Sequence, residues 1–143
     1  MSLSSPGYSA TPLATKLGMK EGTCFMPVNA PPDYLGWLGE LPKGLTSTTR
    51  VSAAVDIVHV FSTTRADLTR VLKRLRTAIR ADAAVWVSWP KKASKVPTDI
   101  SEDVIREVAL PLGFVDIKVC AVTDAWSGLK LVVRKEFRKG AAP

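Results

Sequence analysis

The stretch VWVSWPKKASK, residues 85–95, combines residue types that could bind a ligand. Two tryptophans lie in or beside an apolar run, and Lys91, Lys92 and Lys95 follow around the small hydroxyl of Ser94. Ammonium groups on flexible stems attract phosphate or carboxylate, and indole rings offer flat surfaces for stacking. A solvated loop, with the tryptophans closing the core, is the alternative interpretation. The stretch therefore indicates either an anion-binding edge or a solvent-exposed turn.

Residues that could carry catalysis or hold a metal are few and isolated. Ser88 and Lys91 fit a Ser-x-x-Lys pattern, but acylases with that motif need the serine to open a helix, and Pro90 and the preceding strand place Ser88 at a strand end. His59 is the only histidine and lies inside the apolar run IVHVF, which favours a hydrogen-bonded core histidine over a base or metal ligand. We therefore predict neither a catalytic nor a metal site.

The loop after the first predicted strand bears on the cofactor. It reads Asn29-Ala30-Pro31-Pro32, which contains no glycine and two prolines without amide donors. A dinucleotide or methyl-donor site in an α/β sheet normally has a glycine-rich turn here, because small residues let the backbone approach the cofactor. The sequence therefore does not support S-adenosylmethionine as a cofactor, and the cofactor is unknown.

The net charge of +7 arises within one segment. Between Arg65 and Lys95 there are nine basic and two acidic residues, whereas the rest of the chain has eleven of each sign. One side of the polar face of a helix here carries the following cations: Arg65, Lys73, Arg76 and Arg80. Such a face could bind nucleic acid phosphates without sequence preference. It lacks an aromatic residue for base stacking, so a solvated cationic face is the alternative.

Hydrophobic periodicity predicts the elements that position these residues. Strands are predicted in GTCFMPVNAPP, LTSTTRVSA, AVDIVHVFST, AAVWVSW, FVDIKVCAV and GLKLVVRK. Helices are predicted in TPLATKLG, DYLGWLGEL, TTRADLTRVLKRLRTAIRADA and from Thr98 or Ser101 until Pro111 and Gly113. Alternating strands and helices imply right-handed crossovers. The predicted fold is α/β, three-layer and Rossmann-like, a mostly parallel sheet with a C-terminal antiparallel strand.

In such a sheet the carboxyl ends of the parallel strands share one edge, where ligands bind. The loops that begin at Asn29, Ser62 and Ser88 should meet there, and Trp126 joins them if the last two strands form a hairpin. We expect anion contacts from the lysine stretch, stacking on tryptophan and a polar anchor from Asn29. The predicted ligand-binding residues are Asn29, Trp89, Lys91, Lys92, Ser94, Lys95 and Trp126.

The length of 143 residues allows one domain with a core that needs no cross-links. We predict a flexible segment over 1–10, a single Rossmann-like domain over 11–139 and a tail over 140–143. Cys24 and Cys120 lie in separate predicted strands as small hydrophobes, which favours a reducing cytoplasm. No secretory pattern opens the chain and no apolar run approaches the length of a membrane span, so we expect no membrane partner.

Four long stretches resemble a family of small bacterial proteins classed as a domain of unknown function. They are YSATPLATKLG, NAPPDYLGWLGELP, WVSWPKKASKVPTDISEDVIREVALPLGFVDIKVCAV and WSGLKLVVRK. The resemblance covers nearly the whole chain and implies no activity, catalytic residue or substrate. From residue 54 onward the order of elements also resembles the second half of a class I methyltransferase, which implies a reduced version of that fold without its glycine-rich donor loop.

The leading functional prediction is a non-catalytic binding or regulatory module, with a nucleotide- or phosphate-like anion at the carboxyl edge of the sheet. Two alternatives stay open. One is a divergent transferase that uses S-adenosylmethionine. The other is weak, sequence-independent nucleic-acid binding through the basic helix 65–80.

Overall fold

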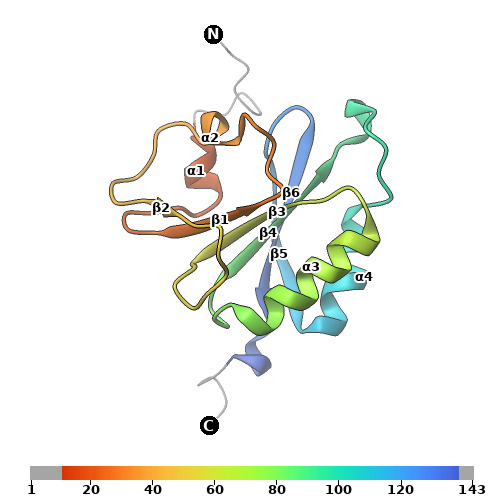
Figure 1. The fold of residues 1–143 in the computed structure, drawn as a ribbon. Coiled ribbons are helices and arrows are strands. Elements are labelled where there is room, and N and C mark those ends of the chain that lie inside the picture. The colour runs from red at the N-terminus through yellow and green to blue at the C-terminus, as the bar shows by residue number, and fades with distance from the viewer. Residues whose placement is uncertain (1–10, 139–143) are drawn as a thin grey trace.

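A six-stranded sheet lies between two layers of helices in the computed structural model, which describes residues 11–138 (Figure 1). The predicted flexible start (1–10) and tail (140–143) lie outside the described residues. The elements run in chain order as α1 (Leu13–Lys16), β1 (Cys24–Val28), α2 (Tyr34–Trp37), β2 (Thr46–Ser47), β3 (Ile57–Phe61), α3 (Arg65–Ala78), β4 (Ala84–Pro90), the 3₁₀ turn η2 (Lys92–Ser94), α4 (Glu102–Ala109), η3 (Leu110–Leu112), β5 (Phe114–Ala121), β6 (Trp126–Val133) and η4 (Lys135–Phe137).

The strand order is β2-β1-β3-β4-β6-β5. The first four strands pair in parallel, whereas β6 pairs antiparallel with both β4 and β5. This topology confirms the predicted α/β, three-layer, Rossmann-like fold, including its antiparallel C-terminal strand. Pro27 has no amide hydrogen to donate, yet it is tolerated inside β1. Backbone alternation points its nitrogen toward the side of β2, and β2 has already ended at Ser47, opposite Phe25. On that side of β1, the carbonyl of Phe25 accepts a hydrogen bond from the Thr48 amide.

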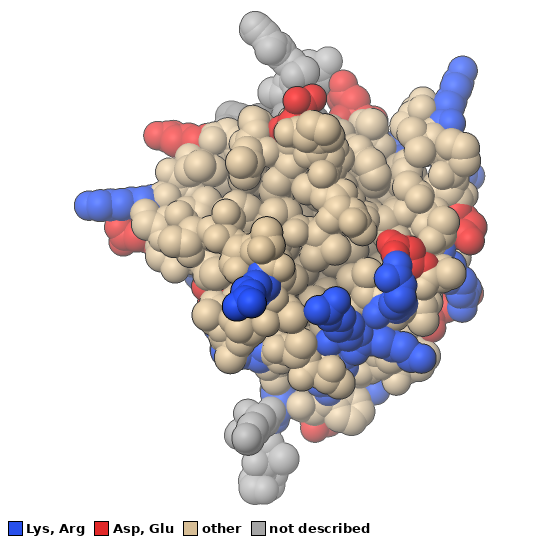
Figure 2. Space-filling view, in the orientation of Figure 1, with Lys and Arg blue, Asp and Glu red and all other residues tan. Residues whose placement is uncertain are grey.

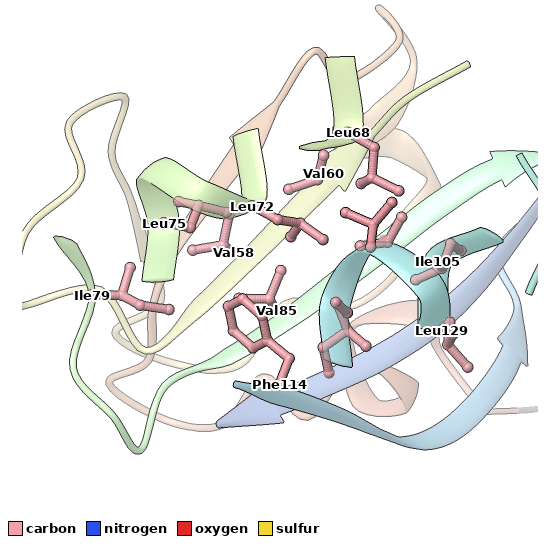
Figure 3. Packing of buried hydrophobic residues seen from close by; sticks show 14 of the residues in the cluster. Val58, Val60, Leu68, Leu72, Leu75, Ile79, Val85, Ile105, Phe114 and Leu129 are labelled. Atoms are coloured by element: carbon pink, nitrogen blue, oxygen red, sulfur yellow. The ribbon is translucent and has the colours of Figure 1, made fainter. Parts of the chain in front are cut away.

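Both faces of the central strands β3 and β4 are apolar and covered. Helices α3 and α4 cover one face, where Leu68, Leu72 and Leu75 of α3 point toward the valines of β3 and β4 (Figure 3). Helices α1 and α2 pack on the other face, against a cluster rich in aromatic residues that includes Phe61 and Trp86. The strands between them are mostly buried on both sides, as the continuous apolar runs predicted.

The two long helices begin at hydroxyl caps. The side chain of Thr64 accepts a hydrogen bond from the Asp67 amide, and Ser101 accepts one from the Val104 amide. Helix α3 is shorter than its sequence pattern predicted, because it ends at Ala78. Beyond that end the Arg80 guanidinium turns back to Asp56 and Asp82, each at 2.8 Å. Arg80 therefore lies outside the helix on which we predicted it.

The two cysteines lie apart from each other and form no disulfide within the described residues. Cys24 and Cys120 are free and half-buried, and they pack against the core clusters on opposite faces of the sheet. Across residues 11–138, no group of three or more histidine, cysteine or acidic side chains is arranged to hold a metal ion. In the same range, every helix is too short or too polar to cross a membrane.

Candidate functional site

The carboxyl ends of β1, β3 and β4 meet at one edge of the sheet, at the top of Figure 1. Because β6 runs antiparallel to β4, it begins where β4 ends, and Trp126 pairs directly with Pro90. The Lys91 amide donates a 2.8 Å hydrogen bond to the Ala125 carbonyl. The structure therefore places Trp126 and the turn of residues 91–95, which we call the lysine turn, side by side on this edge.

A cavity of about 240 Å³ opens beside Trp126. We call it the edge cavity, and its lining consists of Asn29, Phe61, Ser62, Thr63, Asp67 and Trp126. The Trp126 ring meets the ring of Phe61 edge-on, with centroids 5.1 Å apart, so a buried aromatic residue fixes its orientation. Asn29 has a φ of 58°, a left-handed conformation that asparagine tolerates better than most residues. The cavity thus combines a supported indole with an amide on an exposed turn.

The polar wall of the edge cavity is acidic. Asp67 lies in the first turn of α3, and one of its carboxylate oxygens accepts a 3.3 Å hydrogen bond from the Ser62 hydroxyl. Its other oxygen pairs with Arg70 on the next turn of the helix. Within the part of the chain that the structure describes, no lysine or arginine lines the cavity. Ligand hydroxyl or amino groups can therefore bind at this wall, whereas an anion inside the cavity would meet the Asp67 carboxylate.

The lysine turn lies on the rim and outside the lining of the cavity. Lys92 and Lys95 are exposed and Lys91 is half-buried. The Ser94 hydroxyl donates a 2.6 Å hydrogen bond to the Lys91 carbonyl and accepts one from the Val96 amide. The one hydroxyl proton of Ser94 is used in the hydrogen bond to the Lys91 carbonyl. Ser94 therefore cannot also donate to an anion in the way that we predicted. The lysines remain as the cationic part of the rim.

Trp89 does not join Trp126. Alternation along β4 turns Trp89 to the same face as Val85 and Val87, under α3 and α4, where its side chain is only 8% exposed. Trp126 packs on the opposite face of the sheet. The stacking surface that we predicted from Trp89 is therefore part of the core, and Trp126 alone of the two lines the cavity.

A buried polar chain lies behind Phe61. The Tyr34 hydroxyl is 2.9 Å from Nδ1 of His59, and Nε2 of His59 is 2.7 Å from the Ser88 hydroxyl. His59 is fully buried, and burial lowers its pKa to about 3, so the imidazole is neutral. Burial also raises the pKa of Tyr34. The predicted core histidine is confirmed: both of its nitrogens have partners and neither reaches solvent.

Figure 2 shows lysine and arginine side chains gathered over α3. Three of the four cations predicted for nucleic-acid binding are nevertheless engaged in contacts within the protein. Arg65 pairs with Glu107 at 2.6 Å, and Arg80 is held by the carboxylates of Asp56 and Asp82. The guanidinium of Arg76 lies over the Phe137 ring, 5.8 Å from its centroid. Lys73 is exposed. Phosphates would have to compete with these internal contacts, so nucleic-acid binding stays a prediction without added support.

The fold is shared with solved methyltransferase structures at low sequence identity. A protein from Sulfolobus solfataricus, described as a type 11 methyltransferase, aligns with a TM-score of 0.61 and 14% identity over 85% of this chain and 89% of that one. A SAM-dependent methyltransferase from Aquifex aeolicus aligns with a TM-score of 0.57 and 14% identity over 84% and 87%. The chain has the class I methyltransferase fold. The tRNA methyltransferase TrmK of B. subtilis aligns at 0.53 and 8% identity, over 85% of this chain and 64% of that one.

Comparison of the sequence with family models and with curated proteins identifies no family for this chain. No family model matches the chain. No curated protein matches it either. The resemblance to small bacterial proteins of unknown function therefore stays a prediction, and the likeness to methyltransferases concerns the fold alone.

Sequence reasoning identified Asn29 and Trp126 but missed the rest of the cavity lining. Ser62 and Thr63 had been placed at the correct edge without a role. Phe61 was hidden in an apolar run, where nothing separates a cavity-lining ring from a core ring. The place of Asp67 at this edge is predictable from the sequence. An acid in the first turn of a helix that follows a parallel strand must lie at the ligand-binding edge.

Proposed function

We propose that this protein is a non-catalytic binding module for a small nucleotide-like ligand at the carboxyl edge of its sheet. One juxtaposition supports the proposal: Trp126 lines the edge cavity and also adjoins the lysine turn. A planar ring of the ligand stacks on the indole of Trp126. Its hydroxyl or amino groups bond to Asn29 and Asp67. Its phosphate lies outside the cavity, beside Lys91 and Lys92.

The charge distribution fixes the orientation of such a ligand. The cavity wall carries the Asp67 carboxylate, which repels an anion, and the rim carries the ammonium groups of the lysine turn. A ligand with a neutral ring at one end and a phosphate at the other matches both parts. Phosphate alone matches only the rim, and a neutral nucleoside matches only the cavity.

Titration calorimetry with AMP, adenosine and inorganic phosphate tests this orientation. We expect AMP to bind more tightly than either of the other two probes. Trp126→Ala should weaken AMP binding by about tenfold or more, because stacking of a base on an aromatic ring contributes roughly 1–3 kcal/mol. The double variant Lys91→Ala/Lys92→Ala should weaken the binding of AMP and leave that of adenosine unchanged.

Lys73→Ala is the matched control, because Lys73 is an exposed lysine on α3 and does not line the cavity. It should bind AMP as the wild type does. The proposal is wrong if the wild type binds none of the three probes, or if AMP binds the Trp126 and lysine variants as tightly as the wild type.

A divergent S-adenosylmethionine-dependent transferase is the second candidate, and it is supported by the fold of the solved neighbours, one of which was determined as a complex with SAM. The residues present do not fit this cofactor. Pro31 and Pro32 offer no amide donors after β1. The side chain of Tyr34, which follows them, is 3% exposed and packs edge-on against the rings of His59 and Phe61.

A thermal-shift experiment separates the two candidates. Because a ligand that binds only the folded state stabilises it by about 2.7 kcal/mol at a hundredfold excess over Kd, a bound donor would raise the melting temperature by several degrees. We expect S-adenosylmethionine and S-adenosylhomocysteine to raise the melting temperature no more than adenosine does at the same concentration. A larger, concentration-dependent rise that disappears in Asn29→Ala would show that the whole cofactor binds at this edge and would contradict our conclusion.

A further inference from the structure

A second hollow lies on the face of the sheet that α3 and α4 cover. Its volume is about 340 Å³, and we call it the β1 groove. Its lining consists of Met26, Pro27, Val28, Thr49, Val51, Arg70, Val71, Arg74 and Leu75. Most of these side chains are apolar, and the polar exceptions are one threonine and two arginines. Strand β1, the loop after β2 and one side of α3 therefore form its floor and walls.

The groove exists because helices cover only part of this face. Strand β1 lies next to the β2 end of the sheet, and the chain returns from β2 to β3 through residues 48–56 without a helix. Helix α3 packs beside α4 over the neighbouring strands (Figure 1). Val28, Val51 and Val71 are consequently only half-buried, although they pack against the main core.

The two arginines give this apolar hollow a definite charge. Arg70 and Arg74 lie one helical turn apart on α3, and both are exposed. Arg70 already pairs with Asp67. Across residues 11–138, the Arg74 guanidinium makes no hydrogen bond and no ion pair with another side chain. A guanidinium can donate two parallel hydrogen bonds to a carboxylate, so Arg74 is placed to receive one at the margin of an apolar surface.

We propose that the β1 groove binds a small monocarboxylate with an apolar body, of the medium-chain fatty acid class. The hydrocarbon chain lies on Met26, Val51 and Val71, and the carboxylate bonds to Arg74. The volume lies within the range of about 300–1,000 Å³ that is usual for small-molecule sites. The lining also has their usual composition, mostly apolar with few polar groups.

This site is independent of the edge cavity. The two linings share no residue, and the groove lies on the α3 side of the sheet whereas Trp126 packs on the other side. The two linings adjoin at two places: Arg70 of the groove pairs with Asp67 of the cavity, and Val28 of the groove precedes Asn29 of the cavity in the chain. A ligand in the groove therefore requires neither Trp126 nor the lysine turn.

Titration calorimetry of the full chain with octanoate, at concentrations where octanoate is monomeric, tests the proposal. We expect saturable binding to the wild type, with octanol and octyltrimethylammonium weaker by at least tenfold because neither carries a carboxylate. Arg74→Ala should weaken octanoate binding by about tenfold or more, and Arg74→Lys should recover part of that loss. Lys73→Ala, the neighbouring exposed cation outside the groove, should have no effect.

The remaining outcomes decide between this site and the others. Unchanged octanoate binding in Trp126→Ala supports the groove, whereas a loss of binding there would move the ligand to the edge cavity and overturn the proposal. Equal affinity of octanoate and octyltrimethylammonium would mean apolar adsorption without recognition of the carboxylate, which also overturns it. An absence of octanoate binding to the wild type would do the same.

Discussion

Replacing Trp86 by alanine is expected to lower the free energy of unfolding by about 3–5 kcal/mol, the usual range for removing a buried aromatic side chain. Trp86 is fully buried in β4 and belongs to the aromatic-rich cluster under α1. Its indole N–H donates a 2.9 Å hydrogen bond to the carbonyl of Leu17, just after α1. Urea unfolding followed by circular dichroism measures the loss, because the substitution itself changes tryptophan fluorescence.

Two further variants separate packing from hydrogen bonding in this contact. Trp86→Phe keeps most of the apolar volume and removes the donor, so it should cost about 1–3 kcal/mol for the unpaired Leu17 carbonyl. Trp37→Ala is the control for loss of an indole, and its cost should be smaller because Trp37 is half-buried on α2. If Trp86→Ala lowered the free energy of unfolding no more than Trp37→Ala does, the burial of Trp86 and its bond to Leu17 would not be a major contribution to stability.

Much of the fold could be predicted because hydrophobic periodicity is a local property. The run IVHVF is apolar at every position, which is typical of a strand covered on both faces, and β3 is buried at every position. The prediction of α3 overran its C-terminus because the pattern of apolar residues continues to Ile79, which is buried in an extended conformation. The ion pair of Arg80 with Asp56 joins residues that are 24 positions apart in the sequence, so no local pattern shows it.

The candidate site could be predicted only as far as strand order determines it. The antiparallel return of β6 brought Trp126 beside the lysine turn, as the short link between the last strands indicated. The burial of Trp89, by contrast, is predictable from the sequence. Residues at i, i+2 and i+4 of a strand share a face, so Trp89 lies on the same buried face as Val85 and Val87. The partners of His59 come from two other elements, and the sequence alone gives no means of choosing Tyr34 and Ser88.

Neutral His59 makes the stability of the fold depend on pH. Its pKa is about 3 in the folded protein against an ordinary value of 6.5, because burial disfavours the imidazolium. Between these values the unfolded chain binds a proton that the folded chain does not. The contribution of neutral His59 to the free energy of unfolding is complete above about pH 6.5. As the pH falls toward 3, this contribution is lost at about 1.4 kcal/mol per pH unit. From pH 6.5 to pH 4.5 the expected loss is therefore about 2–3 kcal/mol.

The variant His59→Gln isolates this contribution, because His59 is the only histidine and glutamine can still hydrogen-bond without titrating. The variant should be less stable than the wild type at pH 7.5, and its stability should depend much less on pH down to 4.5. Asp56 stays ionised in the folded protein across that window, because bonds from the Cys24 amide and Arg80 lower its pKa below the ordinary value. Urea unfolding across the window measures both slopes. Equal slopes in the two proteins would show that His59 takes up its proton in the folded state, and the Tyr34–His59–Ser88 chain would then open to solvent behind the edge cavity.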